Sequence, residues 1–313
     1  MATYKEIKGS NVENFSSDPA NPINGQVWYN TTSSTLKVAE VNTLGSWATG
    51  GNMTTARGGL AGAGTQTEGL AFGGGYPASV KTEEYNGSAW TGGGDLSTAA
   101  FQLAGAGTQT AALAFGGNDS AATVTVEYNG TAWTGGGNLN TGRQELAGAG
   151  TQTAGLAFGG APGTPAKQAT EEYNGTAWTN GGNLGTPRET LAGCGTQTAG
   201  LAFGGSPSAT EEYNGTAWTN GGNLNLERRQ LAGAGTQTAG LAMGGQMPTP
   251  GAAELYDGTS WTNGGTMNTP RSYPGGAGTQ AAGLAMGGAT PSYTTATEEF
   301  TGPGTTITTV TTS

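Results

Sequence analysis

A segment that recurs about every 43 residues constrains the fold of this chain more than any other feature. The pattern Leu-Ala-Gly-x-Gly-Thr-Gln-Thr-x-x-Leu-Ala-(Phe or Met)-Gly-Gly starts at Leu60, Leu103, Leu146, Leu191 and Leu231, and a more divergent sixth copy has Pro274 at that position. Successive copies start 43, 43, 45, 40 and 43 residues apart. Self-similarity at this period indicates an array of one supersecondary unit rather than two different domains.

Each repeat predicts four short β-strands. The first is Leu-Ala-Gly-x-Gly, the second Gly-Leu-Ala-Phe-Gly-Gly, the third Thr-Glu-Glu-Tyr, and the fourth starts at a tryptophan such as Trp90. Asn-Gly between the third and fourth strands favours a two-residue type I′ hairpin. Helices are not expected, because 61 of the 313 residues are glycine and no i, i+3, i+4 apolar spacing persists.

Four strands in a unit of this length are typical of a blade of a β-propeller. The small residues suit the innermost strand, where blades converge, and the tryptophan suits the wide outer rim. The alternative is a disordered low-complexity chain, because the sequence is rich in glycine (61 residues) and also contains 13 prolines. We reject it because Trp, Tyr, Leu and Phe recur in fixed register, which disorder does not require.

The glycine pair after an apolar strand, the following aromatic residue and the later tryptophan resemble the kelch repeat. An arginine three positions before the first leucine adds to the resemblance, at Arg57, Arg143, Arg188, Arg228 and Arg271, with Ala100 in the second repeat. The resemblance covers roughly residues 47–300 and implies an all-β, kelch-like propeller. It does not imply one function, because kelch propellers serve as enzymes, adaptors and attachment proteins.

We interpret the repeated arginines as structural, each guanidinium binding backbone carbonyls of a neighbouring blade. The alternative is a ring that binds an anionic sugar, which Ala100 would interrupt. The adjacent glutamates of the third strand point to opposite faces of a strand, so they do not form an acid/base pair. We interpret these glutamates as solvated strand ends that block edge pairing.

The two ends of the chain do not match the repeat. We expect a virion anchor or linker at 1–22, a hairpin and a closing strand at 23–51, the propeller repeats at 52–300, and a Thr-rich strand or tail at 301–313. An open ring would expose two sheet edges. The simplest closure pairs the strand at Trp47 with the strand Glu298–Phe300 and gives six blades, and a seventh, incomplete blade from residues 25–49 is the alternative.

The N-terminal hairpin carries a second resemblance. Gly-Gln-Val-Trp-Tyr-Asn, followed by Leu-Lys-Val at 36–38, resembles a segment of bacteriophage tail-fibre and related virion proteins. The opening Tyr-Lys-Glu-Ile-Lys-Gly, with the turn-rich residues 16–22, resembles structural proteins of marine phages. This implies a virion protein made in the host cytoplasm, which agrees with the lack of an apolar secretory signal at the first residues.

The composition argues against several kinds of chemistry. There is no histidine and only one cysteine, Cys194, so catalytic triads, internal disulfides and Cys-rich zinc sites are excluded. We expect Cys194 to be a buried, inert thiol. The net charge of −10 argues against nucleic acid or an anionic membrane as a partner. We therefore expect no enzyme activity, no catalytic residues, no cofactor and no metal.

Length differences among the first five repeats lie in one loop. From the second glycine of Gly-Gly to the residue before the third-strand aromatic, the separations are 10, 10, 12, 7 and 10 residues, and the rest of each repeat is constant at 33. A constant scaffold with loops that vary on one face is typical of binding proteins. The variable loops are 75–82, 118–124, 161–169, 206–209, 246–252 and 289–295, and the predicted binding residues in them are Tyr76, Lys81, Asn118, Asp119, Lys167, Met247 and Tyr293.

These observations favour a structural virion protein of a bacteriophage, a fibre or spike on the tail or capsid, that displays a propeller for binding a host surface or a subunit. The expected partners are other virion proteins, through the N-terminal segment, and a host glycan or protein. We expect a homo-oligomer in the virion, with no membrane insertion. The alternative is an intracellular kelch-type scaffold, and a glycan-active enzyme is the least favoured, because paired carboxylates would have to meet across blades.

Overall fold

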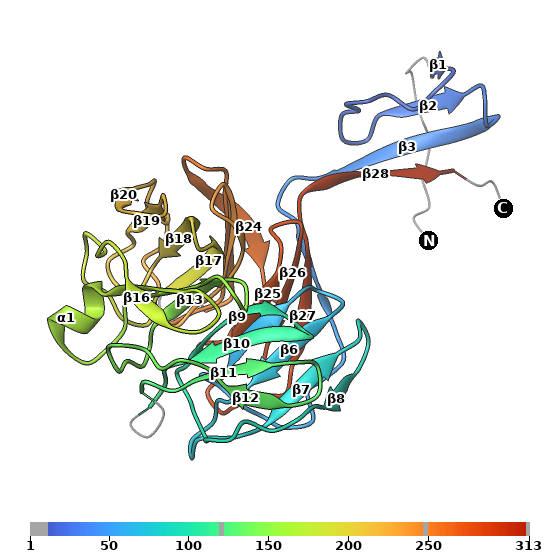
Figure 1. The fold of residues 1–313 in the computed structure, drawn as a ribbon. Helices are drawn as coiled ribbons and strands as arrows, with labels where there is room; N and C mark the ends of the chain where they lie inside the picture. Colours follow the sequence, from blue (N-terminus) through green and yellow to red (C-terminus); the bar gives the residue numbers. More distant parts are fainter. Residues whose placement is uncertain (1–11, 119–121, 247–249, 311–313) are drawn as a thin grey trace. The chain divides into compact units, whose positions relative to one another are not determined.

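The computed structural model describes residues 12–118, 122–246 and 250–310, and these residues form an all-β protein (Figure 1). Within those ranges the one helix is α1 (Gly163–Gln168), which is six residues long. The strands form seven four-stranded sheets. Six of the sheets share one plan and belong to one compact unit, Ser46–Gly302, and the seventh belongs to a second unit made of both ends of the chain. The expected all-β, repeated architecture is confirmed.

The repeated sheets are antiparallel and follow the four predicted strands of each repeat. They are β5 (Ala61–Gly64), β6 (Gly69–Phe72), β7 (Thr82–Tyr85), β8 (Trp90–Gly92); β9 (Ala104–Thr108), β10 (Ala111–Phe115), β11 (Thr125–Tyr128), β12 (Trp133–Gly135); β13 (Ala147–Gly150), β14 (Gly155–Phe158), β15 (Thr170–Tyr173), β16 (Trp178–Asn180); β17 (Ala192–Thr196), β18 (Ala199–Phe203), β19 (Thr210–Tyr213), β20 (Trp218–Asn220); β21 (Ala232–Thr236), β22 (Ala239–Met243), β23 (Ala252–Tyr256), β24 (Trp261–Thr266); and β25 (Gly275–Gly278), β26 (Ala282–Met286), β27 (Thr297–Thr301), β4 (Ser46–Thr49).

The sixth repeated sheet is completed by the N-terminal strand β4. Trp47 lies opposite Phe300, and Thr49 lies opposite Glu298, in an antiparallel pairing of β4 with β27. The expected pairing of the Trp47 strand is therefore confirmed. The first strands of the six sheets also contact one another in cyclic order, from β5 through β9, β13, β17 and β21 to β25, which contacts β5 again. This arrangement is propeller-like.

In the first five repeats, three side chains bind the preceding sheet, as the second repeat shows. The Gln109 amide donates hydrogen bonds to the carbonyl oxygens of Gly69 and Tyr85 at 2.9 and 2.7 Å. The Tyr128 hydroxyl donates to Glu84 at 2.6 Å. The Trp133 indole N–H donates to the hydroxyl of Thr82 at 2.9 Å. Glutamine, tyrosine and tryptophan therefore recur at fixed positions because each meets a partner on the neighbouring sheet.

A buried ion pair lies inside most of the repeated sheets. Arg143 and Glu171 are fully buried and lie 2.9 Å apart, and the same guanidinium donates to the carbonyl oxygens of Gly159 and Ala169. Burial lowers the pKa of Arg143, and the charge of Glu171 opposes that shift. Equivalent pairs are Arg57–Glu83, Arg188–Glu211, Arg228–Glu254 and Arg271–Glu298.

These pairs correct two expectations. The arginines bind carbonyls of their own sheet rather than of a neighbouring blade. The first glutamate of each pair is not a solvated strand end but the buried partner of the arginine, since a buried carboxylate requires a cation and hydrogen-bond donors. The second glutamate, such as Glu84, accepts the tyrosine hydroxyl of the next sheet.

The second repeat lacks the ion pair altogether. Ala100 stands at the arginine position and Val126 at the position of the buried glutamate, and both pack into one apolar cluster. Both charges are replaced together, which avoids a single buried charge without a partner.

The other compact unit is a small sheet that joins the two ends of the chain, Met1–Gly45 and Pro303–Ser313. Its strands are β1 (Glu13–Phe15), β2 (Val27–Asn30), β3 (Thr35–Asn42) and β28 (Gly304–Thr309), with β28 antiparallel to β3. Asp18 accepts hydrogen bonds from Asn30 at 2.8 Å and from buried Trp28 at 3.1 Å, and the bond from Asn30 contributes most to lowering the Asp18 pKa. Residues 13–15 and Asp18 therefore pack against the hairpin.

Removal of one charge from a buried pair is expected to destabilise the protein strongly. Arg143→Ala leaves Glu171 buried without a cation, which costs about 3–5 kcal/mol of unfolding free energy. Arg143→Ala combined with Glu171→Val copies the second repeat and should recover at least about half of that loss. Chemical denaturation measures both variants. Lys81→Ala, which removes an exposed pair with Asp95, is the control and should cost less than about 1 kcal/mol. A double variant no more stable than Arg143→Ala would contradict this account.

Stability is expected to fall between pH 10 and pH 12. Burial, with the hydrogen bond to a glutamate of the preceding sheet, raises the pKa of Tyr85, Tyr128, Tyr173 and Tyr213 to about 12. A tyrosine in the unfolded chain ionises near about 10. Because the unfolded state loses these protons first, the stabilisation is complete below that pH and is lost as the pH rises toward 12. Thermal unfolding followed by circular dichroism measures this loss, and a melting temperature constant over that window would contradict it.

Candidate functional site: the variable face and its axial ring

The loops that vary in length lie at the same end of the sheets as the start of each first strand. This follows from the antiparallel order, because the second strand returns to the end where the first began. Isolated β-bridges join the two regions, for example Gln144 with Ala161 and Ser272 with Ala289. We call this end the variable face. The opposite end carries turns of nearly constant sequence, such as Thr-Gln-Thr and Asn-Gly.

Six residues, one immediately before each first strand's leucine or proline, form a closed ring of backbone hydrogen bonds. Each N–H donates to the carbonyl oxygen of the equivalent residue in the preceding repeat, at 2.7 to 3.0 Å. We call these residues the axial ring. They are Gly59, Gln102, Glu145, Thr190, Gln230 and Tyr273.

The backbone of the axial ring has the conformation that glycine adopts most easily. Gly59 has a φ of 65°, and the five other residues have φ values of 56° or 57°. Such a conformation costs an L-residue about 1–2 kcal/mol. Thr190 is the least compatible of the five, because its side chain branches at the β-carbon. Five strained positions therefore carry side chains where glycine would fit without strain.

The ring side chains surround a shallow depression of about 80 Å³. Gln102 donates its amide N–H to Glu145 at 2.7 Å, and Gln230 donates to the Tyr273 hydroxyl at 2.6 Å. Burial and the charge of Glu189 raise the pKa of Glu145, and Lys167, Gln102 and Arg229 oppose that shift. Burial also raises the pKa of Tyr273. The ring thus gathers amide, carboxyl and hydroxyl groups at one point.

The sequence analysis did not identify this ring. Its signal is present in the alignment of the repeats, since Gly, Gln, Glu, Thr, Gln and Tyr occupy the position directly before the nearly constant first strand. Loop lengths do not reveal the ring, because a change of residue type at one position leaves the loop length unchanged.

The aromatic residues predicted to bind lie on the loops of the variable face. Tyr76 is 79% exposed and packs edge-on against Phe101, with ring centroids 5.9 Å apart. Tyr293 is 40% exposed and lies so close to Gly58 that a β-carbon on that glycine would be 2.8 Å from its ring. Tyr76 therefore stands beside the residue before Gln102, and Tyr293 stands beside the residue before Gly59.

The polar residues predicted to bind have local partners. The Lys81 amine lies 2.8 Å from Asp95, and the Lys167 amine, at the end of α1, lies 2.9 Å from Glu189. The Asn118 side chain accepts the backbone N–H of Phe101 at 3.0 Å. Two other predicted residues, Asp119 and Met247, lie outside the described residues.

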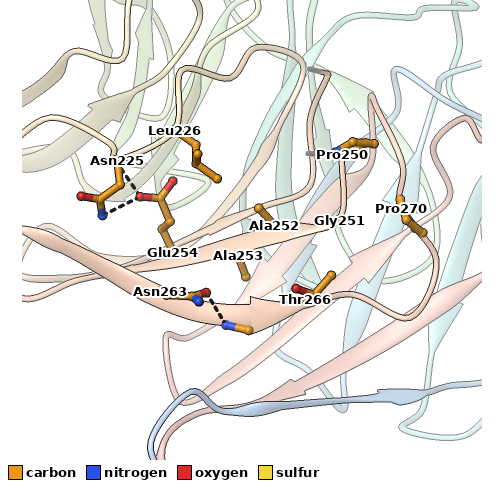
Figure 2. A pocket seen from close by; sticks show the side chains of 11 residues that line it. Asn225, Leu226, Pro250, Gly251, Ala252, Ala253, Glu254, Asn263, Thr266 and Pro270 are labelled. Atoms are coloured by element: carbon orange, nitrogen blue, oxygen red, sulfur yellow. Dashed lines mark hydrogen bonds between the residues drawn. The ribbon is translucent and has the colours of Figure 1, made fainter. Parts of the chain in front are cut away.

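A larger pocket, of about 590 Å³, lies in the fifth repeated sheet (Figure 2). Ala252, Ala253 and Glu254 of β23 line it beside Asn263 and Thr266 of β24. Leu226, Pro250 and Pro270 add apolar surface, and Asn225 donates two hydrogen bonds to Glu254. Glu254 also pairs with Arg228, so its charge is balanced by the scaffold and is not free for chemistry.

The junction between the fifth and sixth sheets keeps the glutamine contact, from Gln280, and lacks the other two polar contacts. Leu255 replaces the glutamate that would accept a tyrosine hydroxyl, and Phe300 replaces that tyrosine. Ala253 replaces the threonine that would accept the indole N–H of Trp47, which has no partner among the described residues. Elsewhere the tyrosine hydroxyl also accepts a glycine N–H, as Tyr128 does from Gly94.

Without that contact, strand β24 remains paired with its own sheet. Thr266 lies opposite Ala252, across a register shift between Ala252 and Glu254. The fourth strands of the preceding four sheets are three residues long, whereas β24 has six. The pocket therefore lies where the outer strand of the fifth repeated sheet, β24, pairs differently from the fourth strands of the other sheets.

Comparisons with known proteins do not assign the chain to a family, since no family model matches it and no curated protein matches it. Within the described residues, no three acidic or cysteine side chains gather in a way that could hold a metal ion. No helix in that part of the chain is long and apolar enough to cross a membrane. Cys194 is buried, as expected, and burial raises its pKa to about 12.

Leu255 and Phe300 are expected to be energetically coupled. Leu255→Glu alone buries a carboxylate without its tyrosine, and Phe300→Tyr alone buries a hydroxyl without its acceptor, so each should cost about 1–3 kcal/mol. The double variant recreates the contact of the other junctions and should recover about 1–3 kcal/mol. Denaturation of all four proteins measures the coupling. Strictly additive effects would show that the two replacements are unrelated.

Proposed function

We propose that this chain is a structural virion protein of a bacteriophage, a fibre or spike on the tail or capsid. In this proposal its six-bladed, kelch-type propeller presents the variable face to a host surface or to a neighbouring subunit. Six sheets of one plan, with first strands in cyclic contact, support the blade count. The recurrent arginine, glycine pair and tryptophan support the kelch type. The resemblance of the N-terminal hairpin to tail-fibre segments supports the virion assignment.

The axial ring carries the argument for binding. Its backbone conformation favours glycine, yet five of the six repeats have a residue other than glycine there. Backbone strain of this kind clusters at sites where function requires a side chain. The first strand that follows each ring residue, by contrast, repeats almost unchanged. Selection for folding alone would favour six glycines, so the ring supports recognition by this face.

The loops add a second reason to place binding on this face. Tyr76 and Tyr293 offer exposed aromatic area, which gives contact at little conformational cost. Any one propeller would bind weakly through so small a set of groups. Many copies on one particle would convert weak contacts into firm attachment, because later contacts form within one complex.

The virion assignment is tested by the particles themselves. Purified particles of the virus that encodes this chain should contain its peptides in a fixed ratio to the other structural proteins, as measured by mass spectrometry. Particles that contain none after removal of host protein would overturn the assignment.

Replacement of the ring side chains by glycine should separate binding from folding. Thr190→Gly relieves the most strained position and should raise the unfolding free energy by about 1 kcal/mol. The combined Gln102→Gly, Glu145→Gly, Thr190→Gly and Gln230→Gly variant should fold and lose attachment to host cells or to the partner subunit. Ser88→Gly, on the opposite end of the first repeated sheet, is the control for attachment. Undiminished attachment of the combined variant would place binding elsewhere.

A further inference from the structure

We infer that the depression of the axial ring binds a protonated primary amine, such as the end of a lysine side chain or the amino group of an amino sugar. This inference rests on the proposed function and names the chemical group that the variable face recognises. The volume, about 80 Å³, is far below the roughly 300–1,000 Å³ of ordinary small-molecule sites. The depression therefore fits one small polar head rather than a whole ligand.

The hydrogen-bonding pattern of the ring leaves acceptors toward the depression. All six backbone N–H groups donate around the ring. Gln102 and Gln230 each direct an amide N–H to a neighbour, Glu145 or Tyr273. The direction of the first bond is fixed, because an ionised carboxylate only accepts. The Gln102 side chain also bonds with the Tyr273 hydroxyl. Among the described residues, the Gln230 amide oxygen and one Glu145 oxygen remain as acceptors.

The charge balance favours a cation. Glu145 is half-buried in the depression and forms no ion pair within the described part of the chain. The two cations that influence it have other partners, since Lys167 pairs with Glu189 and Arg229 donates to Gln246. A partly desolvated carboxylate without a cation is a site where a bound cation gains both charge and hydrogen bonds.

The shape of the site favours an ammonium group over a guanidinium. An ammonium has three donors on a compact centre, which suits acceptors spread around an axis. A guanidinium is planar and binds best when both oxygens of one carboxylate accept its N–H groups. One Glu145 oxygen is already occupied by Gln102, so that paired contact is not offered.

The experiment titrates the full, ¹⁵N-labelled chain with Nα-acetyl-lysine methylamide and with its Nε-acetylated form, which lacks the charge. The expected result is saturable shifts of the axial-ring amide signals with the first probe, with a dissociation constant on the order of millimolar. The acetylated probe should produce no saturable shift. Equal responses to both probes would overturn the inference.

Variants test the position of the charge. Glu145→Gln is compatible with the backbone, because glutamine already occupies this position at Gln102 and Gln230. It should weaken binding of the amine about tenfold or more. Glu145→Gln with Gln230→Glu returns a carboxylate to the ring and should restore binding. Glu68→Gln, at an exposed turn on the opposite face, should leave binding unchanged.

The outcomes separate this inference from the proposed function. Amine binding that survives Glu145→Gln, that falls equally with Glu68→Gln, or that the double variant fails to restore would overturn the ammonium site. Loss of attachment in the glycine variants, without amine binding, would overturn the ammonium site and leave the variable face as the binding surface. Amine binding by the unaltered chain, together with unchanged attachment of the glycine variants, would support the ammonium site and overturn the proposed role of the ring in attachment.

Discussion

The repeated sheets depend on hydrogen bonds by which buried polar side chains meet partners on their own sheet or on the preceding one. In the first five repeats a glutamine, a tyrosine and a tryptophan bind the sheet before, and in the sixth only the glutamine does. In five repeats an arginine and a glutamate pair within the sheet. Burial of apolar surface is limited in a chain so rich in glycine and alanine. Buried groups that lack their partners are costly, so the contacts between sheets specify one spacing and one register.

The exceptions in the sequence follow the same constraint. Ala100 stands at the arginine position of the second repeat, and Val126 stands at the position of its glutamate partner. Likewise, Leu255 stands at a glutamate position, and Phe300 stands at the position of the tyrosine that would bind it. Each replacement removes both members of a contact. The unpaired indole N–H of Trp47 marks the one place in the described residues where a partner was lost and the tryptophan remained. It lies at the junction where β4 from the N-terminal part completes the last repeated sheet.

Much of the scaffold could be predicted from the repeat because its markers report local geometry. The four strands and the pairing of the Trp47 strand needed only period and the requirement to cover an edge. The expected type I′ turn with Asn-Gly at its centre was wrong, because Gly87 has a positive φ, Asn86 does not, and Asn86 bonds to Ala89 across the turn. The partners of the arginines could not be predicted in this way. Arg143 and Glu171 are 28 residues apart, and only the register of the strands shows that they meet inside one sheet. The role of the Thr-rich C-terminal segment, which pairs with β3, also depended on contacts distant in sequence.

The candidate site escaped prediction for a different physical reason. Loop length is visible in a sequence, whereas a left-handed backbone at a non-glycine residue is visible only in a structure. Once the φ values of Gln102, Glu145, Thr190, Gln230 and Tyr273 are known, their variety becomes meaningful, because the scaffold itself favours glycine there. The strain also has to be offset, and the closed ring of backbone hydrogen bonds and the rigid inner strands supply the support. A uniform scaffold can thus hold several strained residues at its axis, and under the proposed function the variety of those residues reflects what the face binds rather than how the chain folds.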